Sequence, residues 1–500
     1  MQLSVIKNAK RNMLFGIANK LIVLLCPFIT QMMVKHIFGI QYIGLKGLFD
    51  SILNVLSLSE LGFGSAIIFF MYKPLSKNDT KEINALLNLY KRVCRYIGVA
   101  ILLFGISVMP FIDNFINGDI PDNINIYFIY TMYLINSVMG YFLYAYMSPV
   151  IIVNQRDDIN STVNSLTLLT LTVSQIIILR ITKNYYFFVV IMLIFTIINN
   201  LWIAIIVKKQ FPTYRAEGNV SPEEKNKIKK VVAGAFIQRC CGTTRNSIDS
   251  ICISSFIGIS LTGIYNNYYM VIKGLIGMQS VFNNSILGGI GNHVATKSVE
   301  ENFQELKRMD FVFLNVNGWC TIFLLCLYQP FMTLWMGSDA LLPFRTVILL
   351  CVYYYVLGIG VVRYMYMETN GLYWEHRWRS IVETAVNVVL NILLGKYFGI
   401  DGIILATMIS LLSCNFIWAN RITFEKYFGK SYLREYYMYQ FRYLIINLVA
   451  ALITYFCCTL IHISTDLLLM LFRIVVCILI PGTIYLFVYN REIKGVKKYL

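Results

Sequence analysis

The sequence predicts an all-α polytopic membrane protein with about fourteen transmembrane helices. The first observation is composition: 57% of the 500 residues are hydrophobic and only 14% are charged, and the mean hydropathy is +0.63. The second is that apolar runs of about 20 residues, enough to cross a bilayer core of about 30 Å, recur along the whole chain. A water-soluble core cannot bury so many runs of this length.

The apolar runs predict the spans in order along the chain. The first run, from Met13 to Val34, follows a basic start but contains Lys20 and lacks a small-residue cleavage site, so we interpret it as a span and not as a signal peptide. The full set of predicted spans is 12–35, 44–71, 93–112, 124–149, 161–180, 185–207, 231–256, 262–290, 309–335, 341–365, 379–397, 402–420, 442–462 and 467–489.

The distribution of basic residues predicts the orientation. If the N-terminus is cytoplasmic, most of the 43 Lys and Arg residues fall in cytoplasmic tails and loops, where they are also denser than in the outside loops. Both termini are then expected in the cytoplasm. Because the basic residues behind the net charge of +17 are spread over short loops, their expected partner is the anionic membrane surface and not nucleic acid.

An internal repeat divides the predicted spans into two halves. Gly39 and Gly44 align with Gly258 and Gly263 at one constant offset along the chain (258 − 39 = 263 − 44). Six spans separate the matched elements, so the halves have the same orientation in the membrane, as in a parallel repeat. The polar segment 208–230, the longest insert between spans, is the expected hinge.

Charges inside spans are the best indicators of a functional site, because each costs about 2.5–3.5 kcal/mol to insert and usually faces a cavity or a partner. Most of them lie in the leading helices of the two halves, which predicts a cationic cavity suited to an anionic substrate such as a phosphate. The candidate substrate-binding residues are Lys20, Lys46, Arg239, Arg245, Lys273 and Arg363. The candidate ion-coupling acids are Asp50, Glu60, Asp249 and Glu383.

A structural interpretation competes with the cavity for some of these residues. Lys46 with Asp50, and Arg245 with Asp249, are four residues apart and could pair along one helix face. Lys20, Arg239, Lys273 and Arg363 have no acidic residue at that spacing, which favours the cavity for them. Arg473 is expected only to extend toward an interface.

Catalytic and metal motifs are not found in the sequence. The four histidines are scattered, and no H-E-x-x-H or nucleotide-binding G-x-x-x-x-G-K-[ST] pattern occurs. The 12 cysteines form no C-x-x-C pair and are expected to be free thiols without a metal. We therefore expect no enzyme activity and no cofactor, so that transport against a gradient would have to use an ion gradient or the membrane potential.

Five blocks of the sequence carry a specific resemblance to a known family: FGIQYIGLKGLFDSIL at 38–53, SELGFGSAI at 59–67, MYKPLSKND at 71–79, KEINALLNLYKRV at 81–93 and the stretch 369–410 beginning TNGLYWEHRW. These blocks resemble the Wzx-type polysaccharide flippases of the multidrug/oligosaccharidyl-lipid/polysaccharide (MOP) exporter superfamily. The resemblance as a whole covers most of the chain, but outside these blocks it is a resemblance in hydropathy alone.

The resemblance implies two pseudo-symmetric six-helix bundles, 1–207 and 231–420, joined by the linker 208–230 and followed by two extra helices and a basic tail in 421–500. It implies alternating access in a bacterial cytoplasmic membrane. The implied cargo is an undecaprenyl-diphosphate-linked oligosaccharide for O-antigen, capsule or exopolysaccharide synthesis, and the implied partners are membrane lipids and the polysaccharide polymerase machinery. Lys20, Arg239 and Lys273 are the positions matched to the basic cavity residues of such flippases.

Three alternatives remain at this stage. A flippase for lipid-linked peptidoglycan precursor and a small-molecule exporter would share the fold, although an exporter of cationic drugs should carry an excess of intramembrane acids, which this sequence does not. A membrane polysaccharide polymerase would share the hydropathy. Such an enzyme needs a large outside loop, and the predicted outside loops are short.

Overall fold

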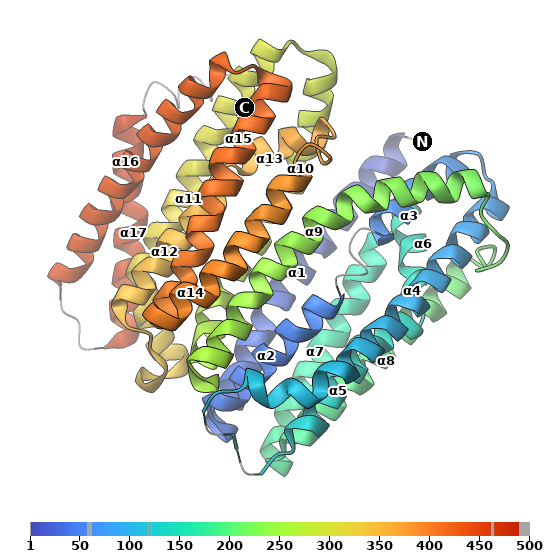
Figure 1. Ribbon diagram of the computed structural model, residues 1–500, viewed down its shortest axis with the longest axis horizontal. Helices are drawn as coiled ribbons and strands as arrows, with labels where there is room; N and C mark the ends of the chain where they lie inside the picture. Colours follow the sequence, from blue (N-terminus) through green and yellow to red (C-terminus); the bar gives the residue numbers. More distant parts are fainter. Residues whose placement is uncertain (1, 58–62, 119, 122, 462–464, 490–500) are drawn as a thin grey trace. The chain divides into compact units, whose positions relative to one another are not determined.

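The computed structural model describes residues 2–57, 63–118, 120–121, 123–461 and 465–489, and over these residues the chain forms helices and no strands (Figure 1). It divides into two compact units, Met1–Gly263 and Ile264–Leu500, called here the first and second units. This confirms the predicted all-α fold class.

The first unit contains nine α-helices among the described residues and the start of a tenth. A 3₁₀ helix, Met109–Phe115, continues α4. The α-helices are α1 (Gln2–Phe38), α2 (Ile40–Leu56), α3 (Phe63–Ser76), α4 (Thr80–Val108), α5 (Ile126–Phe142), α6 (Ser148–Val153), α7 (Asp157–Thr182), α8 (Tyr185–Gln210) and α9 (Pro222–Phe256).

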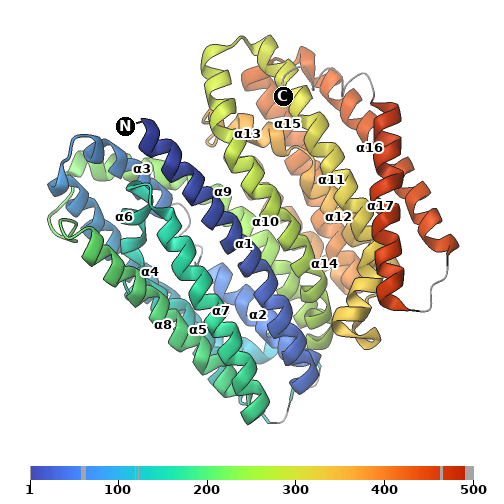
Figure 2. The same cartoon turned by 180° about the vertical axis from the view of Figure 1, so that it is seen from behind.

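Packing in the first unit follows the order of the chain. Helix α1 lies along α7, and α7 along α8, as seen from behind in Figure 2. Helix α5 packs between α4 and α8, and α9 packs against α2. Apolar and aromatic side chains fill one core between α2 and α5, where Phe49 packs edge-on against Tyr130 with ring centroids 5.5 Å apart. A second core lies around α3, α4 and α6.

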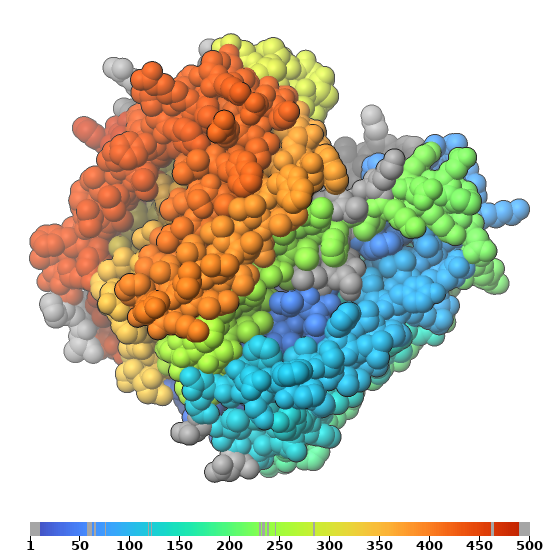
Figure 3. Space-filling view, viewed as in Figure 1, coloured from blue at the N-terminus to red at the C-terminus, as the bar shows by residue number. Residues whose placement is uncertain are grey.

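The second unit is organised around α11, which contacts α12, α13, α16 and α17. In the space-filling view, the side chains of α14, coloured orange, cover part of one face of this unit (Figure 3). Its elements are α10 (Ile259–Thr296, which begins in the first unit), α11 (Val299–Met336), α12 (Phe344–Gly358), α13 (Val361–Thr369), α14 (Arg377–Ser410), the π-helix Leu411–Trp418, α15 (Ala419–Thr423), the π-helix Phe424–Phe428, α16 (Ser431–Leu460) and α17 (Asp466–Val488).

Ten helical segments in the described part of the chain are long and apolar enough to cross a membrane. One of them, Arg377–Phe428, has 52 residues, about twice the length one crossing needs, and its helical geometry breaks at Gly399, where φ is 60° and ψ is −139°. This segment therefore contains the two predicted spans 379–397 and 402–420.

Three predicted spans are not among the ten segments. The predicted span 44–71 includes residues 58–62, which lie outside the described residues, and otherwise falls on α2 and α3, which have 17 and 14 residues and are each shorter than about 20. The predicted spans 231–256 and 262–290 fall on α9 and α10, which are long enough but more polar than the segments that qualify.

Helix positions support the internal repeat. Helices α2 and α10 begin at Ile40 and Ile259, and α4 and α11 begin at Thr80 and Val299, so both pairs have the offset that relates the repeated glycines (259 − 40 = 299 − 80). Asp79 and Ser298, at the same offset, both cap the following helix through their side chains. The sequence offset therefore corresponds to equivalent structural elements.

The repeat-related glycines meet where α2 crosses the first turn of α10, within the first unit. A Cβ atom on Gly263 would lie 2.5 Å from the carbonyl oxygen of Ile40 and 3.0 Å from the amide nitrogen of Gly44. A Cβ atom on Gly44 would in turn collide with the carbonyl oxygen of Ile259. Because Ile40 and Ile259 are equivalent in the repeat, the two contacts are reciprocal. Only glycine permits this close approach of the backbones.

The boundary between compact units lies at Gly263, whereas the predicted hinge is the segment 208–230. The reason is that α9, which the repeat assigns to the second half, packs against α2 and α3. Ser254 at its end also donates a hydrogen bond to the carbonyl oxygen of Phe115 at 2.6 Å.

Candidate functional site

In the first unit, Lys46 and Asp50 form an ion pair on α2, with 2.9 Å between Nζ and Oδ2. Both side chains remain partly exposed. Two buried tyrosines, Tyr133 and Tyr185, lie within electrostatic reach of Asp50 and share a hydrogen bond of 3.0 Å between their hydroxyls. Lys46 and Asp50 therefore form the ion pair along one helix face that their i,i+4 spacing allows.

Lys20 has a different environment. It is exposed on α1, and the apolar side chains of Ile17 and Leu21 beside it are also exposed. An exposed ammonium group on a membrane-spanning helix is costly in hydrocarbon, so a water-filled cavity is its most favourable surrounding. This placement is compatible with the cavity role.

The remaining candidates of the first unit lie on α9 or near α3. Arg245 is half-buried and Asp249 is buried with 3% exposure, four residues apart on α9. The side chain of Arg239 and the whole of Glu60 lie outside the described part of the structure.

In the second unit, Lys273 is exposed on α10 with its ammonium nitrogen 5.1 Å from the ring centroid of Tyr269. Tyr269 stacks in turn on Tyr265, with 5.8 Å between ring centroids. A cation over an aromatic face is attracted by the ring quadrupole, so the tyrosine ring helps to position this ammonium group. Lys273 is thus the second lysine of the candidate set that is exposed, after Lys20.

Arg363 is fully buried and belongs to a cluster of charged side chains. Its Nη2 donates to the backbone oxygen and the side-chain oxygen of Asn415, at 3.1 and 3.2 Å. Arg379 donates to the same side-chain oxygen at 3.3 Å and forms an ion pair with Glu383 at 2.5 Å. The side chains of Arg379 and Glu383 are only 8% and 7% exposed. Asn415 thus joins the two guanidinium groups.

An acid from another helix completes the cluster. Asp310 on α11 accepts hydrogen bonds from Tyr439 at 2.9 Å and from Gln440 at 2.8 Å, both on α16, and it lies within electrostatic reach of Arg363. With two arginines and two acids, the cluster is close to neutral. Arg363 and Glu383 are therefore engaged by protein groups: Arg363 by Asn415, and Glu383 by Arg379.

The structure therefore brings together Arg363 with Glu383, and Lys46 with Asp50. The sequence analysis did not select Asp310, Arg379 or Asn415. Arg379 stands four residues before Glu383, so the spacing rule that identified Lys46 and Asp50 would also have found this pair. Asp310 carries no such signal, because its partners lie on α16, far along the chain.

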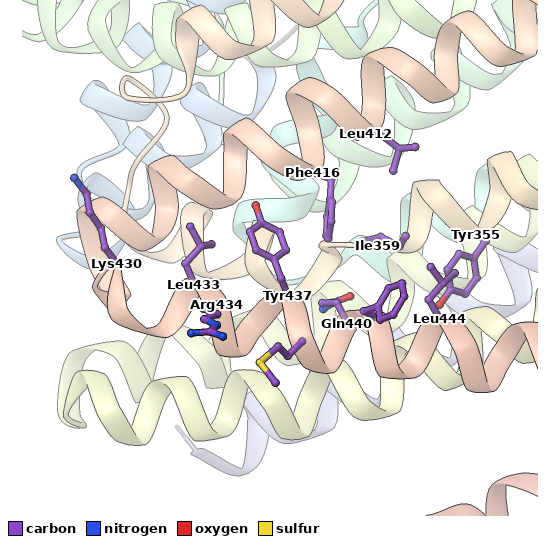
Figure 4. A pocket seen from close by; sticks show the side chains of 12 residues that line it. Tyr355, Ile359, Leu412, Phe416, Lys430, Leu433, Arg434, Tyr437, Gln440 and Leu444 are labelled. Carbon is purple, nitrogen blue, oxygen red and sulfur yellow. The ribbon is translucent and has the colours of Figure 1, made fainter.

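A groove of about 860 Å³ lies beside this cluster, between α12, α16 and the π-helix Leu411–Trp418. Figure 4 shows Lys430 and Arg434 at one end and Tyr355 and Leu444 at the other. Lys430 is paired with Glu425 at 2.8 Å, and Arg434 is exposed. The lining residues are Tyr355, Ile359, Leu412, Phe416, Lys430, Leu433, Arg434, Tyr437, Met438, Gln440, Phe441 and Leu444.

The groove combines two chemical characters. Its walls are mostly aliphatic and aromatic, while its basic end carries one more positive than negative charge when Glu425 is included. Such a surface suits a molecule with a hydrocarbon chain and an anionic end. A lipid with a phosphate head group has both properties.

Solved structures share this fold. The inward closed form of the lipid II flippase MurJ superimposes with a TM-score of 0.69 at 15% identity, over 96% of this chain and 99% of that chain. An inward-facing multidrug resistance MATE transporter of the MOP superfamily gives 0.62 at 15% identity, over 82% and 95%. A Vibrio cholerae MATE transporter gives 0.58 at 14% identity, over 85% and 98%.

Sequence comparison adds no closer relationship. No protein-family model matches the chain, and no curated protein matches it. The structural likeness to the lipid II flippase nevertheless extends over nearly the full length of both chains. The chain is thus a multi-pass helical protein with the fold of the MOP-superfamily transporters and flippases.

Proposed function

We propose that the protein is a flippase that moves undecaprenyl-diphosphate-linked oligosaccharides across the bacterial cytoplasmic membrane by alternating access. The observation that carries the proposal is the structural likeness to the lipid II flippase over 96% of this chain and 99% of that one. The sequence blocks that resemble Wzx-type flippases favour an oligosaccharide cargo for O-antigen, capsule or exopolysaccharide synthesis. We assign both termini to the cytoplasm, because this orientation puts most basic residues in cytoplasmic tails and loops.

The exposed lysines support an anionic cargo. Lys20 is exposed on α1 of the first unit, and Lys273 is exposed on α10 in the second unit. A diphosphate carries the negative charge that such residues attract in a site of low dielectric constant. Arg239 is assigned the same role because the repeat makes it equivalent to Lys20.

The groove beside α16 supports a lipid-linked cargo. Its apolar walls would hold part of the prenyl chain, and Arg434 would lie near the anionic head group. No cofactor is needed for this process. Energy would come from an ion gradient or the membrane potential. Polysaccharide polymerase machinery would receive the product at the outer face.

Among the alternatives, a flippase for lipid-linked peptidoglycan precursor fits best after the leading proposal, because its cargo is also a lipid and the matching flippase carries lipid II. An exporter of cations is less well supported. Two of its candidate acids, Asp50 and Glu383, are engaged by Lys46 and Arg379.

Removing the basic residues should stop transport while the protein still reaches the membrane. In a strain that lacks the gene, Lys20→Ala, Arg239→Ala and Lys273→Ala should each leave lipid-linked oligosaccharide in the inner leaflet, with transport reduced by about tenfold or more for each lost charge contact of about 1.5 kcal/mol. The distribution between leaflets is measured by enzymatic labelling of the sugar from outside the cell.

Two controls make this result specific. Lys20→Arg and Lys273→Arg keep the charge and should restore transport, whereas Lys209→Ala removes an exposed charge at the end of α8 and should have no effect. Normal arrival of the oligosaccharide at the outer face in all three alanine variants would refute the cationic site.

Filling the groove should displace bound lipid. Leu412→Trp adds a large side chain to the groove lining, while Leu448→Trp adds the same group at an exposed position of α16 that does not line it. We expect less anionic lipid to copurify with Leu412→Trp than with Leu448→Trp, as measured by mass spectrometry of the detergent-extracted protein. Equal amounts of lipid would show that the groove holds no lipid.

A further inference from the structure

Three cysteines from three different helices converge in the second unit. Cys326 lies on α11, Cys458 on α16 and Cys477 on α17, and their sulfur atoms all lie within 4.8 Å of one another. All three are buried, with 0%, 1% and 0% exposure. The sequence gives no hint of the group, because its members lie far apart along the chain and form no ligand motif.

The spacing of the sulfur atoms suits a metal ion. Three atoms within 4.8 Å of one another have a common point at most about 2.8 Å from each, which is about 0.5 Å longer than a Zn–S bond of about 2.3 Å. Small side-chain movements would close this difference. Thiolates are the ligands that thiophilic ions such as Zn²⁺ and Cd²⁺ prefer.

A buried free cysteine often serves only as a small apolar side chain. Two features argue for more here. The three sulfur atoms are in mutual contact, so that each thiol has sulfur neighbours where a packed core would offer carbon. A positive charge also lies beside them, since Arg473 acts electrostatically on both Cys458 and Cys477.

Arg473 is fixed in this position by a hydrogen bond. Its Nη1 donates to the backbone oxygen of Cys326 at 2.9 Å. Three thiolates and one divalent cation carry a net charge of −1, and the guanidinium group of Arg473 brings the total to zero. A monovalent ion would leave a net negative charge in the membrane interior, which is costly. Charge balance therefore selects a divalent ion.

We propose that Cys326, Cys458 and Cys477 bind one thiophilic divalent cation of the Zn²⁺ type. Binding replaces three S–H bonds by three metal–sulfur bonds and releases three protons, with no change of oxidation state. The ion fastens the two C-terminal helices, α16 and α17, to α11 at the centre of the second unit. The site stands apart from the transport proposal, because none of its residues belongs to the charged cluster or the groove.

The test uses the full-length protein in detergent, reduced and freed of metal by a chelator, and titrated with Cd²⁺ alone. We expect the ultraviolet thiolate-to-cadmium band to saturate at one ion per chain, with a rise in the temperature of unfolding. Each of Cys326→Ser, Cys458→Ser and Cys477→Ser should weaken binding by more than about 100-fold, because loss of a ligand exceeds the 10- to 100-fold typical of an outer partner. Size-exclusion chromatography verifies that the variants fold.

Cys457→Ser is the matched control, since Cys457 is the neighbour of Cys458 on α16 and is not part of the group. It should bind Cd²⁺ as tightly as wild type. Arg473→Gln should weaken binding by about 10- to 100-fold, and Arg473→Lys, which keeps the charge, by less. These two variants distinguish charge balance from simple packing.

Two results would overturn the proposal. One is that the reduced protein gives no cadmium band, or gives the same band when any of the three cysteines is replaced. The other is that mass spectrometry of the protein purified without reductant finds two of the three cysteines joined in a disulfide and the reduced form binds no Cd²⁺. The group would then be a redox pair and not a metal site.

Discussion

The Gly263→Ala variant should unfold at a clearly lower temperature than wild type, and Gly44→Ala should do the same. At Gly263 the new methyl group would lie 2.5 Å from the carbonyl oxygen of Ile40, a distance at which the two helix backbones must separate. Overpacking of this kind typically costs about 1–3 kcal/mol, and more where the obstacle is backbone. Thermal unfolding of the purified protein, followed by intrinsic fluorescence, measures the difference.

The control for this prediction is Gly277→Ala, on the same helix α10 as Gly263. A Cβ atom there meets no other atom within 4 Å, so the substitution should be neutral or should stabilise the helix by up to about 1 kcal/mol. If Gly263→Ala unfolds at the same temperature as Gly277→Ala, the close crossing of α2 and α10 does not exist in the protein.

The second large effect is expected in the buried ion pair of Arg379 and Glu383. Removing one partner leaves the buried cluster with a net charge in the protein interior, and such changes cost about 3–5 kcal/mol. Arg379→Met and Glu383→Leu should each lower the unfolding temperature strongly. The double variant should recover much of the loss, because a pair of apolar side chains replaces the ion pair without leaving a lone charge.

An exposed pair with the same spacing provides the comparison. Lys297 and Glu301 are also four residues apart and form an ion pair of 3.3 Å, but about half of each side chain is exposed. Lys297→Met should change the unfolding temperature little, because water screens the remaining charge. Equal effects at Arg379 and Lys297 would contradict the burial of the first pair. A double variant no more stable than either single variant would contradict the apolar replacement.

The sequence alone predicts the architecture well, because each crossing of the membrane needs its own apolar run. The repeat offset, read from Gly39, Gly44, Gly258 and Gly263, also predicts the starts of α4 and α11, which were not used to find it. Three of the fourteen predicted spans agree less well with the structure. The span 44–71 falls on the short helices α2 and α3, and the spans 231–256 and 262–290 fall on α9 and α10, which are more polar than the segments that qualify. Polar residues in these helices weaken the hydropathy signal.

The site is predicted only where its contacts are local. The pairing of Lys46 with Asp50 depends on one helix turn and follows from spacing. The contacts of Asp310 with Tyr439 and Gln440, and the meeting of the three cysteines, depend on how α11, α16 and α17 pack. No local pattern encodes these contacts, so they become visible only in three dimensions.

The division into units illustrates a third case. The repeat places α9 at the start of the second half, and the helix starts agree with it, yet α9 packs with the first unit. Sequence symmetry describes how the chain is built, while compactness describes which helices touch. The boundary of the repeat and the boundary of the compact unit differ here, because α9 begins the second repeat but packs with the helices of the first unit.

The central claim is that the protein moves an anionic, lipid-linked oligosaccharide, and transport in vesicles tests it most directly. The full-length protein is reconstituted into liposomes that contain undecaprenyl-diphosphate oligosaccharide with a fluorescent sugar, and a membrane-impermeant quencher is added outside. We expect the quencher to remove the signal of both leaflets, and only that of the outer leaflet in protein-free vesicles or with Lys20→Ala. Quenching confined to the outer leaflet in vesicles with the wild-type protein, together with uptake of a cationic dye by the same vesicles, would contradict the claim and indicate a cation exporter.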